Sequence, residues 1–505
     1  MKLLKIILLP LFSLLCGVAL QAQRVITYES GMGSRDPANS DVWVLFQKVK
    51  AMHEGMTLYA DSATFDTKNN TFRAMRNVKI VISDTTTLYG DNALYDGSSR
   101  IADVWGDTVT LIDGRTILTT DLLSYDRNQS TASYFHWGHT VHDSSTLDSH
   151  KGYYHSDSHD IYLFDQVVLH DSNAWLYTDT LLYNTRSHVA EFISPTTIVS
   201  DSSTVYSEEG TYNSSSHDAC SYRATRLTNG ATRLTADTLF FNDNSEHGEA
   251  YGNVIIFDSS NNVTCYGQMG ITDHKQHFSF VTDSALIVFV DEGDTLYMHA
   301  DTIWAFNNDS NQFEAASAYR GVRIFRADAQ AVCDSVWFSM PDSCVSLFFN
   351  PVVWYEDYQC SADTIECHFD SNGVQLVLLK NNMFAIEKVD AQKFNQVRGK
   401  NGKVFLDDSE PRWADILGSA QMVYYVTEDV KIGETTEQRL VGVNIGVGSD
   451  MRIYFKNREP KRFSTFGNPD MKMYPPDQVP ENERRMQGFE WRDAIRPHSP
   501  AEVWR

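Results

Sequence analysis

Basic residues and paired cysteines are both scarce in this sequence. The chain has 42 Lys and Arg against 66 Asp and Glu, which gives a net charge of −24 at pH 7. Such an excess of acidic groups argues against nucleic acid or an anionic bilayer as the main partner, because cationic side chains hold phosphates. The sequence has seven cysteines and no CxxC pair, and we interpret the six that follow Cys16 as mostly buried small residues. A disulfide among the last four stays open.

Sequence motifs of the common enzyme classes are also missing. No GxSxG, HExxH, Walker or Rossmann glycine pattern occurs. The densest group of metal-ligand side chains is a histidine run between residues 136 and 159, but strand parity places His136 and His139 on opposite faces. We therefore predict a protein that is not an enzyme, with no cofactor, no catalytic residues and no metal site.

Long apolar runs are confined to the start of the chain. Lys2 and Lys5 precede an apolar core from 6 to 15, and Leu20-Gln21-Ala22 ends on a small residue. This order is typical of a secretory signal peptide cut after Ala22. The segment is too short for a membrane anchor, which needs about 20 apolar residues. Loss of the two lysines changes the net charge from −24 to −26.

A repeat runs through most of the sequence. The phrase Leu-Tyr-x-Asp-x-apolar-x-aromatic-Asp/Asn returns with gaps of 29 to 33 residues. Its central position is occupied in turn by Asp61, Asp91, Asp121, His150, Asp179, Glu208, Asp237, Gln268, Asp301, Asp334 and Asp363. Because His and Gln replace the carboxylate in some repeats, we interpret it as a structural polar group near a turn. A period of this length predicts an array of similar supersecondary units.

Each repeat is predicted to be a pair of antiparallel strands. Apolar residues alternate in segments such as 77–84 and 253–258, which indicates strands with one buried face. Clusters of Asp, Asn, Ser and Gly, as in 66–70 and 96–99, predict tight turns between them. Glycines 106, 138, 252 and 321 fall inside predicted strands and indicate a bend or bulge there. A strand that bends can contribute to two facing sheets.

The repeats resemble the OstA-like, or LptA-like, periplasmic lipopolysaccharide transport proteins. The resemblance rests on strands of the type Gly252-Asn253-Val254-Ile255-Ile256 and on the phrase from Leu88 to Asp96, and it covers roughly residues 42–491. Segments 452–456, 466–470 and 488–492 are similar to the end of the long versions found in Bacteroidetes-type bacteria. The resemblance implies an all-β fold, an elongated antiparallel folded-sheet β-jellyroll built from repeats of roughly 30 residues.

The same resemblance implies a function. The protein would be a non-enzymatic periplasmic carrier or bridge that shields lipopolysaccharide acyl chains in an apolar β groove during transport to the outer membrane. Its partners would be lipopolysaccharide and other lipopolysaccharide transport proteins at the inner and outer membranes, and not nucleic acid. Outer-membrane association and end-to-end self-association of protomers stay open.

We expect five parts and a set of inward side chains. The parts are a signal peptide (1–22), a lead-in (23–41), the repeat region (42–380), degenerate repeats (381–473) and a proline-rich irregular tail (474–505). Tail aromatics such as Trp491 are expected to cap the last open strand edge. The candidate lipid-binding residues are Val78, Ile80, Ile82, Val109, Leu111, Val167, Leu169, Val254, Ile256, Val322 and Ile324. An ordinary packed core has the same pattern, so a structural or adhesive envelope rod with a sealed β core is the alternative.

Overall fold

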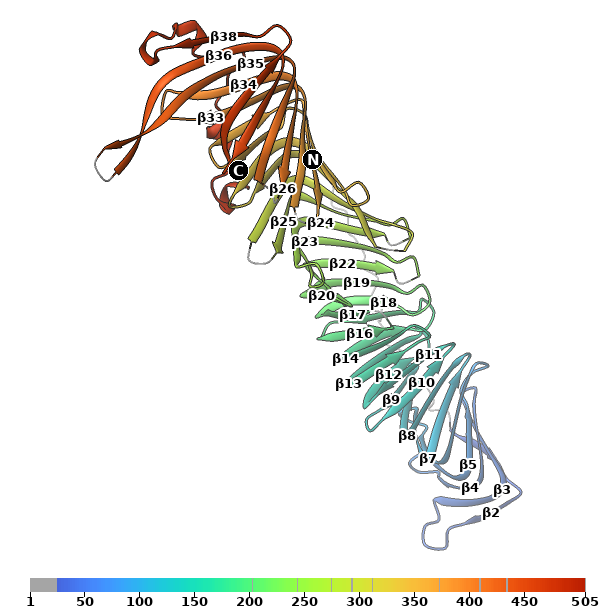
Figure 1. Cartoon of the computed structure of the whole chain (residues 1–505). Helices are drawn as coiled ribbons and strands as arrows, with labels where there is room; N and C mark the ends of the chain where they lie inside the picture. The colour runs from blue at the N-terminus through green and yellow to red at the C-terminus, as the bar shows by residue number, and fades with distance from the viewer. Residues whose placement is uncertain are drawn as a thin grey trace, which may run out of the picture. The chain divides into compact units, whose positions relative to one another are not determined.

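The computed structural model describes residues 25–504 apart from 202, 243, 274, 292, 293, 311, 372, 408, 409, 433 and 434. The predicted signal peptide, residues 1–22, lies outside the described residues. The described chain forms 38 β-strands and four short 3-10 helices, and no α-helix occurs in it (Figure 1). None of these described helices is long and apolar enough to cross a membrane. The predicted all-β antiparallel fold is confirmed.

The chain divides into two compact units. Unit 1 holds the described residues up to Ser172 together with Asp179–Ser187, and unit 2 holds Asn173–Thr178 and the chain from His188 onward. Strand β14 (Ala174–Asn184) is shared between them.

Unit 1 is a series of antiparallel hairpins. Its strands are β1 (Thr27–Glu29), β2 (Met32–Arg35), β3 (Val42–His53), β4 (Met56–Asp66), β5 (Thr71–Val81), β6 (Thr86–Asp96), β7 (Ile101–Asp113), β8 (Thr116–Asp126), β9 (Thr131–Tyr134), β10 (Gly138–His142), β11 (Ser145–Ser149), β12 (Lys151–His155) and β13 (Asp160–His170). From β3 to β8 each strand pairs with the next. Strands β1 and β2 both pair with β3.

Unit 2 continues with the same hairpin pattern and then with longer strands. Its first strands are β15 (Val189–Phe192), β16 (Thr196–Ser200), β17 (Ser203–Ser207), β18 (Glu209–Asn213), β19 (Asp218–Arg223), β20 (Thr225–Asn229), β21 (Thr232–Ala236), β22 (Thr238–Asn242), β23 (His247–Asp258), β24 (Val263–Asp273), β25 (Phe278–Asp291) and β26 (Asp294–Asn307). They are followed by β27 (Phe313–Phe325), β28 (Ala329–Ser339), β29 (Cys344–Phe348), β30 (Val352–Tyr355), β31 (Tyr358–Ser361), β32 (Thr364–Asp370), β33 (Gly373–Lys388), β34 (Phe394–Asp407), β35 (Glu410–Ile432), β36 (Thr435–Lys456), β37 (Glu459–Phe466) and β38 (Asp470–Tyr474). The tail carries only the short helices η1 (Pro476–Gln478), η2 (Glu481–Glu483), η3 (Asp493–Ile495) and η4 (Pro500–Glu502).

The turns form where the Asp and Asn clusters predicted them. After β4, the Asp66 carboxylate accepts hydrogen bonds from the backbone N–H groups of Lys68 and Asn69, both at 3.0 Å. The Asn69 backbone bond is the largest cause that holds the pKa of Asp66 below its usual value. Side chains that bond the backbone two or three residues ahead fix a tight turn locally, so each hairpin is closed by its own residues.

The acidic repeat position holds a bulge on the neighbouring strand. In unit 1, Arg76 and Asn77 adopt left-handed φ values of 65° and 52° at a register shift in β5. The Asn77 side chain donates to Asp61 Oδ2 at 2.7 Å. In unit 2, Asn253 donates to Asp237 Oδ2 at 2.9 Å in the same way. The polar group therefore lies at a bulge, whereas the sequence placed it near a turn.

Glycine is required at some of these bulges. Gly252 has φ +73°, and a Cβ there would lie 2.3 Å from the Asp237 carboxylate. A Cβ on Gly106 would lie 2.3 Å from the Asp91 carboxylate. Register shifts occur around residues 106, 252 and 321, which confirms the predicted bulges. At the fourth glycine, Gly138, the strand is interrupted between β9 and β10.

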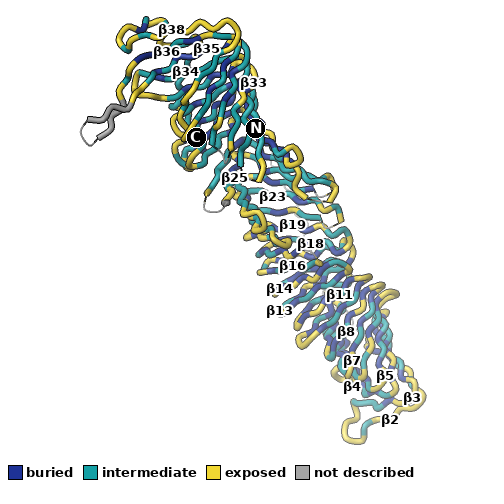
Figure 2. Tube along the Cα trace, in the orientation of Figure 1, coloured by how far each residue is buried: buried dark blue, intermediate teal, exposed yellow. Residues whose placement is uncertain are grey.

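The interior of unit 1 is packed with aromatic rings. In β3 to β13, one face of each strand is buried at alternate positions (Figure 2), and it includes Phe72, Tyr95, Tyr134 and Tyr154. The phenol groups are satisfied: Tyr154 donates to Asp113 Oδ2 at 2.7 Å and Tyr134 bonds Ser149 Oγ at 2.7 Å. Buried tyrosines need such partners, so these rings are hydrogen-bonded members of a buried core in unit 1.

Candidate functional site

A continuous row of apolar side chains crosses unit 2 on the inner face of its strands. Each member lies directly opposite the next on the neighbouring strand. In order they are Leu234, Ile256, Cys265, Ile287, Met298, Ile324, Ala331, Val353, Cys360, Ala385, Val397 and Met422. All except Ala331 and Met422 remain partly exposed. We call this set the first row.

A second row lies on the other part of the same strands. It runs across β28 to β37 through Phe338, Val345, Cys367, Val377, Val404, Ala414, Ile453 and Phe463. Members of both rows pack against one buried cluster that includes Val336, Leu347, Ile365, Leu379 and Ile416. The two rows and this buried cluster together form an apolar inner surface of unit 2, built mainly from aliphatic, Met and Cys side chains, with Phe338 and Phe463 in the second row.

Three cysteines report on the polarity of this inner surface. Desolvation by burial raises the pKa of the Cys265 and Cys367 thiols to about 12 and that of Cys360 to about 11. All three side chains nevertheless keep some exposed area. A partly exposed thiol with so high a pKa lies among apolar atoms on most sides. All six described cysteines are free thiols, so no disulfide crosses this surface.

The structure places the predicted inward residues at strand positions that face the interior, but their exposed fractions differ between the two units. In unit 1, the candidates in β5, β7 and β13 are at most 2% exposed: Val78, Ile80, Val109, Leu111, Val167 and Leu169. Ile82 lies just after β5 and is half-buried. In unit 2, Val254 and Val322 are buried, while Ile256 and Ile324 belong to the partly exposed first row. Whether any of them binds lipid stays a prediction.

Several members of the inner surface were not predicted from the sequence. They include Met298, Val353, Cys360, Cys367 and Val397. The same alternation of apolar and polar residues continues through their strands, and it would have pointed to them. It is weaker there because Cys, Met and Ala stand at inner positions that hold Val, Ile or Leu in the clearest repeats.

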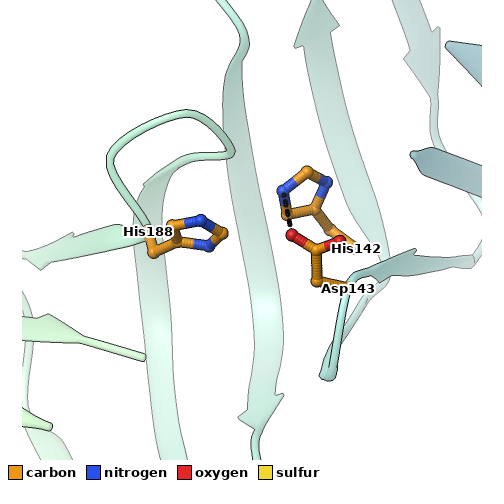
Figure 3. Close-up of side chains that lie close together, drawn as sticks. All are labelled: His142, Asp143 and His188. Atoms are coloured by element: carbon orange, nitrogen blue, oxygen red, sulfur yellow. Dashed lines mark ion pairs between the residues drawn. The ribbon is translucent and has the colours of Figure 1, made fainter. Parts of the chain in front are cut away.

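The histidines of the run between residues 136 and 159 interact with different partners. His139 Nδ1 lies 2.6 Å from Asp148 and His136 Nδ1 lies 3.1 Å from Asp121. His142 Nε2 pairs with Asp143 at 3.5 Å, as Figure 3 shows. His188, the third side chain in that view, belongs to unit 2. The His136, His139 and His142 side chains each pair with a different carboxylate in unit 1.

The tail packs on the outer face of unit 2. Gln359 donates to the Glu490 carbonyl and accepts from the Arg492 N–H, both at 2.8 Å. Gln396 bonds the carbonyl of Arg484 and the N–H of Met486 in the same two-sided way, at 2.8 and 2.9 Å. Each buried amide thus binds the tail backbone as a neighbouring strand would.

Aromatic contacts hold the same tail segment. Phe489 and Trp491 each pack against Phe394 of β34 with ring centroids 5.3 Å apart. From the sequence, we predict that these rings cap the last open edge. In the structure they cover the outer face of β33 and β34 instead, because Phe394 provides an apolar partner there.

Comparison with known proteins assigns part of the chain to a family. A family model described as OstA-like protein matches residues 25–170 and 161–237. The chain carries an OstA-like region. This region includes unit 1 and β15 to β21 of unit 2, and the first row runs mostly beyond it. No curated protein matches the chain.

One solved structure illustrates how far the likeness reaches. It is LptH from Pseudomonas aeruginosa, described as the LptA homologous periplasmic component of the conserved lipopolysaccharide transport device. The match has a TM-score of 0.22 and 13% sequence identity, and it covers 29% of this chain and 95% of LptH.

Proposed function

We propose that the protein is a non-enzymatic periplasmic lipid carrier or bridge whose unit 2 inner surface shields the acyl chains of lipopolysaccharide on the way to the outer membrane. The observation that carries the proposal is the partial exposure of two apolar rows that share one buried cluster. The OstA-like region supports it, and the resemblance of the repeats to lipopolysaccharide transport proteins supplies the ligand class. Partners at the inner and outer membranes follow from the same proposal.

The physical reason is the cost of exposing lipid tails to water. Each methylene removed from water contributes about 0.8 kcal/mol, so an apolar surface lowers the barrier to moving a lipid without any chemical step. Aliphatic, thioether and thiol groups suit this role because they offer no strong hydrogen bond that water would satisfy better. The acidic exterior keeps phosphate groups of the ligand in solvent.

The structural rod with a sealed β core is the second candidate. Unit 1 favours it, because its inner positions are fully buried and filled by large rings such as Phe72 and Tyr95. Under this reading the protein would act as a spacer or adhesive element of the envelope, and no guest would enter the interior.

Site-specific photo-crosslinking in cells distinguishes the two. A crosslinking residue at Ile256 or Ile324 should capture lipopolysaccharide. Ile255, the next residue of β23, is exposed on the outer face, and it is the matched control that should capture far less. Equal capture at Ile255 and Ile256, or no capture at either first-row position in folded protein, would favour the sealed core.

A further inference from the structure

An aromatic platform covers part of the outer face of unit 2. Phe280 and Trp304 pair across β25 and β26, with ring centroids 4.5 Å apart and planes at 32°. Trp304 also stacks on Phe306, with centroids 6.1 Å apart and planes at 9°. Phe306 in turn contacts Trp337 of β28 at 5.8 Å. These rings alternate with buried inner residues such as Ile303, so they face away from the inner surface.

An open cavity of about 510 Å³ lies at the edge of this platform. Its apolar wall is made by Phe280, Trp304 and Tyr319, and its polar wall includes Asp301, Asp334 and Arg320. The volume lies within the range of small-ligand sites, which combine apolar walls with a few placed polar groups. By contrast, the two rows of the unit 2 inner surface consist of apolar side chains.

The polar wall is open to solvent and has a negative balance. Asp301 Oδ2 and Arg320 Nη1 are 3.6 Å apart, and their side chains are 47% and 83% exposed. Asp334 accepts a hydrogen bond from the Ser335 hydroxyl at 2.7 Å. Two carboxylates against one guanidinium disfavour a phosphate or another anion. The carboxylates can accept hydrogen bonds from the hydroxyl groups of a neutral ligand, and the Arg320 guanidinium can donate to them.

We propose that this cavity binds a pyranose ring of a neutral saccharide. The C–H face of such a ring is apolar and packs on aromatic faces such as that of Trp304, while its hydroxyl groups donate to carboxylates at the ring edge. Asp301 and Asp334 occupy that edge. The proposal is independent of acyl-chain binding, because it uses the outer face of β25 to β28 and different chemistry.

Calorimetric titration of the full mature chain tests the proposal. The probes are neutral hexose oligosaccharides, an acidic oligosaccharide, and intact lipopolysaccharide as the glycolipid. We expect a neutral oligosaccharide to bind the wild type. The Trp304→Ala variant and the double variant Asp301→Asn/Asp334→Asn should each bind it about tenfold or more weakly, which is the effect of losing one good contact. Trp337→Ala is the matched control, because Trp337 belongs to the platform but does not line the cavity. The affinity of the Trp337→Ala variant for the neutral oligosaccharide should stay near that of the wild type.

The outcomes distinguish binding at this cavity from binding at the inner surface, and a free glycan from a lipid-borne one. Binding of a neutral oligosaccharide supports the site for free and lipid-borne glycans alike, whereas equally tight binding of the acidic oligosaccharide would overturn the preference for a neutral saccharide. If only intact glycolipid binds and the Trp304 and aspartate variants leave that binding unchanged, the proposal is overturned. It is also overturned if no neutral saccharide binds the wild type, or if Trp337→Ala weakens binding as much as the double Asn variant. Circular dichroism checks folding, and the double Asn variant keeps the test valid if Trp304→Ala misfolds.

Discussion

The two units use one repeat to build two kinds of interior. In unit 1 the aromatic residue of the repeat phrase, such as Tyr95, is fully buried, and strands β4 to β8 are 11 to 13 residues long. In unit 2 the corresponding Tyr212 is still buried, but Phe241 is only half-buried, and strands β33 to β36 reach 14 to 23 residues. Apolar alternation therefore sets which face is inward, but it does not decide how far the side chains on that face are buried.

The largest expected effect is on the core of unit 1. Phe72→Ala removes a fully buried ring and should lower the free energy of unfolding by about 3 to 5 kcal/mol. Ile324→Ala in the partly exposed first row should cost only about 1 to 2 kcal/mol, because part of its surface is already in contact with water. Urea unfolding followed by circular dichroism measures both. Equal costs would mean that the two interiors are packed alike.

The outer face distinguishes the units in a second way, because in unit 2 it carries the tail. Gln359→Ala removes both amide bonds to the tail backbone and should weaken tail docking by about 1 to 3 kcal/mol. Limited proteolysis should then cleave more rapidly after residue 474. Gln375→Ala is the control, since Gln375 is bonded to Asp370 of its own hairpin and not to the tail. Unchanged cleavage in the Gln359 variant would show that Phe489 and Trp491 hold the tail alone.

A smaller effect is expected at two glycines of positive φ, Gly55 in the β3–β4 turn of unit 1 and Gly252 at a bulge of unit 2. Gly252 and Gly55 both have positive φ, but only Gly252 lies against a neighbour, the Asp237 carboxylate. Gly55→Ala should cost about 1 kcal/mol from backbone strain, and Gly252→Ala about 1 kcal/mol more from the close contact. Thermal unfolding of the two variants gives the difference. A null difference would show that the Asp237 side chain moves aside freely.

The inward parity and the turns could be predicted from sequence because both are local. Val78 and Ile80 alternate with polar neighbours, and Asp66 bonds its own turn. Exposure could not be predicted in this way, since whether Ile256 is covered depends on side chains far along the chain. The docking of the tail on Gln359 and Gln396 left no sequence signal either, because it uses backbone groups of the tail. The role of the acidic repeat position was missed because its partner, such as Asn77 for Asp61, lies on the next strand.

The smallest perturbation, thiol alkylation, tests directly whether the inner surface of unit 2 is accessible. Burial raises the pKa of both Cys265 and Cys333 to about 12, but Cys265 is partly exposed whereas Cys333 is buried. Their rates of reaction with an uncharged maleimide should therefore differ only because the reagent reaches the Cys265 thiol more easily than the Cys333 thiol. Cys265 should react about 100-fold more slowly than an exposed thiol at pH 8, because its much smaller thiolate fraction is only partly offset by the greater nucleophilicity of a thiolate of high pKa. Cys333 should react more slowly still.

The pH dependence and the ligand dependence complete this test. Because the folded pKa is raised, the thiolate fraction at Cys265 should rise about tenfold per pH unit up to pH 11. The same shift means that the free energy of unfolding falls as the pH rises above the unfolded thiol pKa of about 8.5 toward the folded value. Bound lipopolysaccharide should protect Cys265, Cys360 and Cys367 on the inner surface and leave the already slow Cys333 unchanged, as mass spectrometry of each cysteine peptide would show. Equal rates at Cys265 and Cys333 in the absence of lipid would mean that unit 2 is closed as unit 1 is, and the rod would then be the better description of both units.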